Sequence, residues 1–192
     1  MPEKPPALLT FTESCDIMET KKGDFVSVME DLELQIIREA IASLRQEGLR
    51  FSVDTLAERL KISKKTIYRF FPDKEALATA LYDRYYTDAQ ARAQALVGTH
   101  GHDACPALLA LYFDAKHMTR SEIFNKFRLN EALFAYTASK NDALWQTIVP
   151  AFAGVPEEDR AAVRIIIDGA FEKLLRLQLS PDAVIERLVK GL

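Results

Sequence analysis

Apolar residues recur at intervals of three and four over most of this chain, which is the spacing of one face of an α-helix. Residues 31–47 show the pattern clearly, with Leu34, Ile37, Ile41 and Leu44 on one side and charged residues on the other. Nowhere do apolar and polar residues alternate between turn signals, as they do in a half-buried β-strand. The sequence therefore predicts an all-α protein.

Residues 52–77 contain two short helices and the start of a third. Ser52 and Ser63 each stand where a serine hydroxyl caps the free amides of a first helical turn. Only two residues separate the helices, and the second turns Ile67 and Phe71 inward. Helices this short must dock on a neighbour, so we expect a helix-turn-helix that rests on the preceding helix.

Positive charge is concentrated in this segment. Residues 59–74 hold six basic residues and one acidic residue, although the whole chain of 192 residues has a formal net charge of −3. The second helix of a helix-turn-helix lies in the major groove of DNA, and a local positive field attracts phosphate. The outward-facing residues of that helix suit DNA: Lys64, Lys65, Thr66, Tyr68 and Arg69.

The stretch LAERLKISKKTIYRFFPDKEAL resembles the DNA-binding segment of the tetracycline-repressor (TetR) family. The matching positions are Ala57, Ser63, Thr66, Tyr68, Phe71, Lys74, Glu75 and Leu77. The resemblance implies that Lys64, Lys65 and Thr66 touch bases or nearby phosphates. It also implies that Tyr68 and Lys74 hold the backbone, and we expect Arg69 to do the same. The complete set of expected DNA-binding residues is Ser52, Lys64, Lys65, Thr66, Tyr68, Arg69 and Lys74.

Two positions depart from the family pattern. The family usually has glycine at the turn, whereas Lys61 here needs a left-handed conformation that costs about 1 kcal/mol. Phe70 occupies a position that is often histidine or tyrosine, and phenylalanine cannot donate to a phosphate. These departures keep open an alternative function, a ligand- or protein-binding helical module of TetR-like fold that has lost DNA binding.

Three regions follow from this pattern. Residues 1–30 begin with prolines and form a leader, either flexible or with a short extra helix at 25–29. Residues 31–77 form the helix-turn-helix DNA-binding domain. A long helix from Lys74 to about Val97 joins it to a helical effector-binding and dimerisation domain over residues 78–192. Further helices are expected at 107–118, 121–138, 142–152, 157–179 and 181–190.

Residues 160–179 are apolar around most of the helix, more than one core-facing stripe needs. We expect one face inside the protomer and another against a second copy, as TetR-like proteins dimerise through their last two long helices. The alternative is a fully enclosed helix. The expected dimer residues are Ile165, Ile166, Leu174, Val184, Ile185 and Leu188.

The TetR resemblance also implies a pocket for an unknown small-molecule effector in the middle helices. Its expected lining residues are Phe113, His117, Phe127, Asn130, Phe134 and Trp145. Aromatic residues at helical spacing equally well fill a core, so both interpretations stand.

Other classes of function find little support. Cys15 and Cys105 lie in dissimilar surroundings, which favours a reducing compartment over a disulfide framework. There is no secretory signal and no run of eighteen apolar residues, so we expect a cytoplasmic protein without a membrane partner. His100, His102 and Cys105 suggest zinc, but a solvated loop is favoured. No catalytic motif is present, so neither an enzyme nor a cofactor is expected.

Together these features predict a homodimeric, all-α transcriptional regulator. A two-fold dimer reads an inverted repeat, so the expected target is a palindromic operator in double-stranded DNA. The expected mode of action is a repressor that a small ligand releases.

Overall fold

The computed structural model describes residues 13–47, 52–119, 131–152 and 154–190. Over these ranges the chain forms helices and contains no strand, which confirms the all-α prediction. The α-helices are α1 (Glu13–Glu47), α2 (Val53–Leu60), α3 (Lys64–Phe70), α4 (Lys74–His100), α5 (Cys105–Met118), α7 (Glu131–Ile148), α8 (Arg160–Leu177) and α9 (Asp182–Val189). Short 3₁₀ segments lie at η2 (Gly101–Ala104), η3 (Val149–Ala151) and η4 (Glu157–Asp159).

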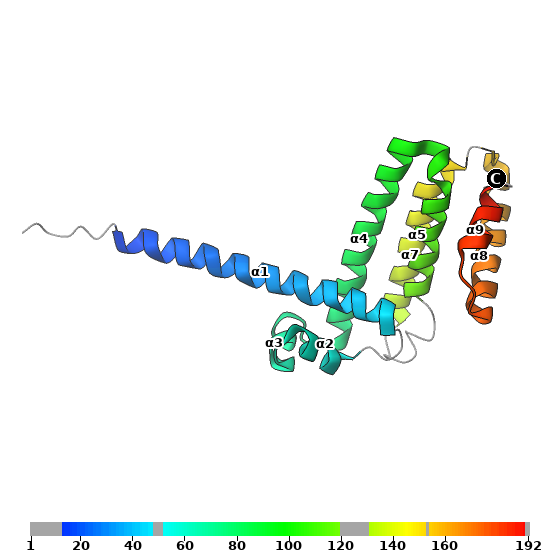
Figure 1. Cartoon of the computed structure of the whole chain (residues 1–192). Coiled ribbons are helices and arrows are strands. Elements are labelled where there is room, and N and C mark those ends of the chain that lie inside the picture. Colours follow the sequence, from blue (N-terminus) through cyan, green and yellow to red (C-terminus); the bar gives the residue numbers. More distant parts are fainter. Residues whose placement is uncertain (1–12, 48–51, 120–130, 153, 191–192) are drawn as a thin grey trace, which may run out of the picture.

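Figure 1 shows two parts that share the long helix α4. Helices α4, α5 and α7 stand side by side, with α8 and α9 beyond them. Helices α2 and α3 and the C-terminal part of α1 lie near the N-terminal end of α4. Helices α1, α2 and α3 are called here the three-helix head. The N-terminal half of α1 extends away from the rest of the molecule. The head is therefore mounted on the body through α4.

Three local caps fix the helices of the head. The hydroxyl of Ser52 accepts a hydrogen bond from the Thr55 amide at 3.2 Å, and that of Ser63 accepts one from the Thr66 amide at 3.0 Å. The Asp73 carboxylate caps α4 by accepting from the Ala76 amide at 2.7 Å. All three caps confirm the predicted helix starts, because each side chain satisfies an amide that has no partner within its helix.

The turn between α2 and α3 closes as the sequence predicts. Lys61 has φ 54° and ψ 39°, the left-handed conformation. Its amide donates to the Glu58 carbonyl at 3.1 Å, and the Ile62 amide donates to the Ala57 carbonyl at 3.0 Å. These paired bonds satisfy the last carbonyls of α2 and hold α3 at a fixed angle to it.

Apolar side chains form the core of the head, apart from one polar network. Ile36, Leu56 and Ile67, one from each helix, have no exposed surface. Ser43 is also fully buried, and its hydroxyl accepts from the Arg59 guanidinium at 3.1 Å. Arg59 forms an ion pair with Glu39 at 3.2 Å, so charged groups as well as apolar contacts join α2 to α1.

The core of the body is built on aromatic residues from α4, α5 and α7. The Trp145 ring lies 5.4 Å from Tyr112 and 5.9 Å from Phe152, measured between ring centroids. Tyr82 is almost fully buried, and its hydroxyl donates to the Met118 carbonyl at 2.8 Å. Burial raises the pKa of Tyr82, so this hydroxyl stays a hydrogen-bond donor.

Two predicted boundaries are corrected. Helix α1 begins at Glu13 rather than at residue 31, because residues 13–30 contain no proline and only one glycine. Helix α7 runs through Lys140 and Asn141, where a turn was expected. The Asn141 amide donates to Thr119 at 3.0 Å and its carbonyl accepts from Tyr86 at 2.9 Å. Those partners on other elements satisfy a side chain that would otherwise compete with the helix.

Candidate nucleic-acid interface and effector cavity

Helix α3 presents its polar side to the outside of the head. Lys65, Tyr68 and Arg69 are exposed, whereas Ile67 on the opposite side is fully buried. Lys74, in the first turn of α4, is exposed as well. The structure thus brings these predicted DNA-binding residues onto the accessible part of the head.

The basic residues of the head differ in what they contact. Lys64 forms an ion pair with Asp54 of α2, and Arg59 is held by Glu39. Among the described residues, no ion-pair partner is found for Lys65, Arg69 or Lys74. These three cations are therefore available to phosphate, while Lys64 must first leave its carboxylate.

The remaining residues of the predicted interface have local roles. The hydroxyls of Ser52 and Thr66 lie 2.9 Å from those of Thr55 and Ser63, within the two caps. Phe70 is partly buried and packs against the core, with its ring centroid 6.4 Å from that of Phe71. Phe70 therefore anchors α3 instead of contributing a polar contact.

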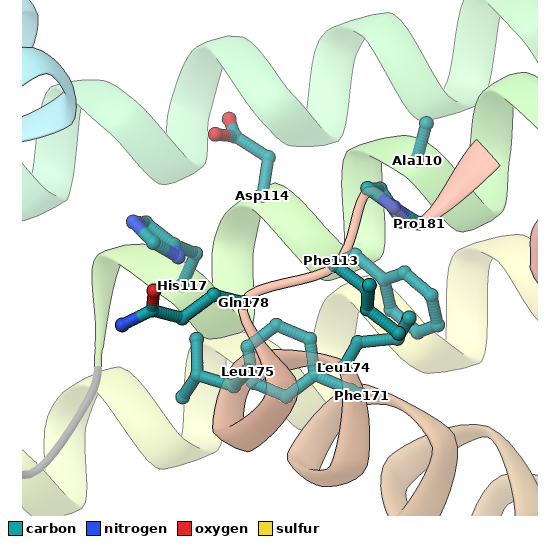
Figure 2. Close-up of a pocket in the computed structure, with 10 residues that line it drawn as sticks. Ala110, Phe113, Asp114, His117, Phe171, Leu174, Leu175, Gln178 and Pro181 are labelled. Atoms are coloured by element: carbon teal, nitrogen blue, oxygen red, sulfur yellow. The ribbon is translucent and has the colours of Figure 1, made fainter.

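A cavity of about 500 Å³ lies between α5 and the C-terminal part of α8 (Figure 2). Apolar side chains form most of its wall, together with one carboxylate, one imidazole and one amide. The lining residues are Ala110, Phe113, Asp114, His117, Phe171, Leu174, Leu175, Gln178, Leu179 and Pro181. This volume falls in the range of small-molecule sites.

The predicted pocket residues are distributed differently. Phe113 and His117 line the cavity. Trp145 does not; it is buried in the aromatic core, and Phe134 is 48% exposed. Phe127 and Asn130 lie outside the described residues. The prediction missed the wall that α8 contributes, because helical spacing alone does not show which helix faces α5.

The predicted dimer residues also divide into two groups. Ile165 is 73% and Ile166 59% exposed, so both are free of the protomer core. Leu174 and Ile185 are instead buried inside the protomer, where both belong to its apolar core. Val184 and Leu188 are partly buried and pack against the same core.

The corner between α4 and α5 brings His102 and Cys105 together. The His102 Nδ1 lies 3.1 Å from the Ala151 carbonyl, and the Cys105 thiol donates to the same oxygen at 3.2 Å. Burial raises the pKa of the Cys105 thiol. In the described ranges no three His, Cys, Asp or Glu side chains are grouped to hold a metal ion. Both groups contact the Ala151 carbonyl and so connect this corner to η3.

None of the helices in the described ranges is both long enough and apolar enough to cross a bilayer.

Comparison with known proteins bears on the head. The family model described as "Bacterial regulatory proteins, tetR family" matches residues 36–81. That range covers the C-terminal part of α1, all of α2 and α3, and the start of α4. No curated protein and no solved structure matches the chain. Residues 36–81 thus form a domain of the kind found in the tetR family of bacterial regulatory proteins, the helix-turn-helix DNA-binding domain of a transcriptional regulator.

Proposed function

We propose that this regulator is a repressor that binds a palindromic operator as a homodimer and is released by a small-molecule effector. Residues 31–77 serve as the DNA-binding domain, and residues 78–192 as the effector-binding and dimerisation domain. The observation that carries the proposal is the exposed cationic side of α3 and α4, where Lys65, Arg69 and Lys74 have no ion-pair partner among the described residues.

Each residue of the head has a proposed part in DNA binding. Lys64, Lys65 and Thr66 stand at the first turn of α3 and contact base edges or nearby phosphates. Tyr68, Arg69 and Lys74 hold phosphates on either side. Ser52 contributes through the cap of α2, which positions the helix that crosses the backbone.

The exposed side of α8 supports a homodimer. Ile165 and Ile166 expose most of their surface to solvent, which is unusual for large apolar side chains. Covering them with the same face of a second copy forms a two-fold interface. Two heads related by two-fold symmetry then read two half-sites of an inverted repeat.

The cavity between α5 and α8 supports an effector. It is mostly apolar and has a few polar groups that fix orientation, as small-molecule sites do. We assign the effector to this cavity, with Phe113 and His117 among the residues that touch it.

The first test is DNA capture. The purified protein is mixed with genomic fragments, the retained DNA is sequenced, and fluorescence anisotropy then measures the affinity for the recovered sequence. We expect an inverted repeat, and a loss of binding in Lys65→Ala/Arg69→Ala/Lys74→Ala. The matched control is Lys173→Ala/Arg176→Ala/Lys190→Ala, which removes the same charge from α8 and from the C-cap of α9. Equal loss in both variants, or no retained DNA, would favour the alternative of a head that no longer binds DNA.

A further inference from the structure

Asp114 of α5 stands at the edge of the cavity and reaches the three-helix head. Its Oδ2 atom accepts a hydrogen bond from the Arg45 guanidinium at 2.5 Å and another from the Tyr85 hydroxyl at 2.9 Å. Among the described residues no hydrogen-bond partner is found for its Oδ1 atom. Figure 2 shows Asp114 on the same helix as Phe113 and His117, above the rings that line the cavity.

Arg45 belongs to the last turn of α1, the helix that packs against α2, which in turn packs against α3. Its guanidinium carbon lies 5.3 Å from the centre of the Tyr85 ring on α4. Burial by itself lowers the pKa of Arg45. The hydrogen bond to Asp114 and the charge of that carboxylate raise this pKa, and together with Tyr85 they outweigh the effect of burial, so the net shift is upward. One ion pair therefore connects the cavity wall to the C-terminal end of α1.

Arg45 also has space to move. A second cavity of about 350 Å³ adjoins it, lined by Arg45 and Tyr85 together with Ile41 of α1. Because Arg45 lines this space and its side chain is 41% exposed, open volume is next to the guanidinium when it leaves Asp114.

The wall of the first cavity favours a cation. Asp114 provides a carboxylate, and no lysine or arginine is among the lining residues. The rings of Phe113 and Phe171 lie 5.5 Å apart, and the faces of aromatic rings attract cations. The ammonium of Lys116 already lies 5.6 Å from the centre of the Phe171 ring. His117 and Gln178 add hydrogen-bond acceptors.

We propose that the effector is an apolar molecule with a protonated amine, and that its amine competes with Arg45 for Asp114 and so loosens α1 from the body. This inference rests on the proposed function, because it assigns the class of effector and the contact through which it acts. The side chains of Arg45 and Asp114 are 41% and 34% exposed, and ion pairs that are open to water are weak. A weakly binding amine is therefore sufficient to compete.

The first experiment measures ligand binding without DNA, by calorimetry. Three probes share one body: 2-phenylethylammonium, 2-phenylethanol and phenylacetate. We expect the wild-type protein to prefer the ammonium, and Asp114→Asn to lose that preference. Arg45→Gln should bind the ammonium about two- to fivefold more tightly, because its competitor for the carboxylate is gone. The matched control is Arg84→Gln, which removes another exposed arginine–aspartate pair, with Asp88, and should change nothing.

The opposite signs of the two variants separate competition from a structural role. If Arg45→Gln weakens the ammonium as Asp114→Asn does, the pair merely holds the cavity together and the inference is wrong. Preference for phenylacetate, or binding of none of the three probes, overturns it as well. Thermal melting of each variant verifies that it is folded.

The second experiment adds the operator. Saturating ammonium should weaken operator binding by the wild-type protein about two- to fivefold, the strength of one exposed ion pair. Arg45→Gln should show that loss without ligand and no further change with it. Failure of the wild-type protein to bind any DNA would contradict the proposed function and leave the calorimetric result intact. Operator binding that ignores the ammonium would contradict the inference alone.

Discussion

The outer faces of α3 and α8 are both exposed, but they expose opposite chemistry. On α3, the exposed residues include Lys65 and Arg69. On α8, Ile165 and Ile166 expose most of their surface. Water hydrates the charged groups of α3 favourably, so this face is stable when exposed. Covering the apolar side chains of α8 would lower the free energy of the protein. Exposure thus has a different meaning on the two helices: on α3 it suits contact with a polyanion, and on α8 it leaves apolar surface uncovered.

The largest effect is expected from substitutions that place charge on the exposed apolar face of α8. Ile165→Asp/Ile166→Asp should yield a monomer, because two carboxylates cannot be buried in an apolar interface. Loss of the second head should then lower operator affinity about 100-fold or more. Sedimentation and operator titration measure the two effects.

A control for this variant is Ala91→Asp/Ala95→Asp, which places the same charges on the exposed side of α4. It should remain dimeric. A monomeric control, or a dimeric α8 variant, would show that the exposed isoleucines are not the interface.

In the head, loss of Lys65 and loss of Lys74 should change DNA binding in different ways. Lys65→Ala should cost about 1–3 kcal/mol on the operator and relax its sequence preference, as the loss of a base contact does. Lys74→Ala should weaken all sequences alike and reduce the slope of log K against log salt by about 0.9. Titrations on operator and random DNA at several salt concentrations distinguish the two. A Lys74→Ala protein with the full salt slope would refute its role at a phosphate.

A smaller effect is expected on stability, from the left-handed backbone at two helix ends. Lys61 and Gln178 both have φ 54° and ψ 39°, at the ends of α2 and α8. Glycine adopts this conformation without strain, so Lys61→Gly and Gln178→Gly should each raise the free energy of unfolding by about 0.5–1 kcal/mol. Chemical denaturation measures both, and each variant is the control for the other. A destabilised Lys61→Gly protein would mean that the lysine side chain holds the turn.

The smallest effect concerns the ion pair between Lys64 and Asp54, which are 55% and 64% exposed. Asp54→Asn removes a carboxylate that competes with phosphate for Lys64. We expect affinity for random DNA to rise about two- to fivefold, in proportion to the strength of an exposed pair. Asp88→Asn, which frees Arg84 on α4, is the control and should leave DNA binding unchanged. Unchanged affinity in Asp54→Asn would place Lys64 away from the phosphates.

The head was largely predictable because its determinants are local. A cap needs only the serine or aspartate and the amide three residues later, as at Ser52, Ser63 and Asp73. The left-handed turn at Lys61 follows from the short link of three residues between α2 and α3. Six basic residues in residues 59–74 then indicate a phosphate-binding surface directly.

The body was less predictable because its apolar residues have the same spacing whether they face a core, a cavity or solvent. Trp145 and Phe113 look alike in the sequence, yet only Phe113 lines the cavity. Leu174 and Ile165 lie on one helix, and only the packing of α8 on α5 decides that Leu174 is buried. The sequence around Asn141 predicts a turn, but the tertiary structure places Tyr86 and Thr119 where they hydrogen-bond its side chain within a helix.

The sequence by itself determined that the chain is helical, that residues 52–77 form a capped helix-turn-helix, and that this segment carries the positive charge. These properties depend on hydrogen bonds and side-chain spacing within a few residues. Only the tertiary structure decided where the cavity lies, which apolar face stays exposed, and that Asp114 meets Arg45 across 69 positions of the chain. Contacts between distant segments depend on how helices pack, and no local rule of spacing encodes that packing.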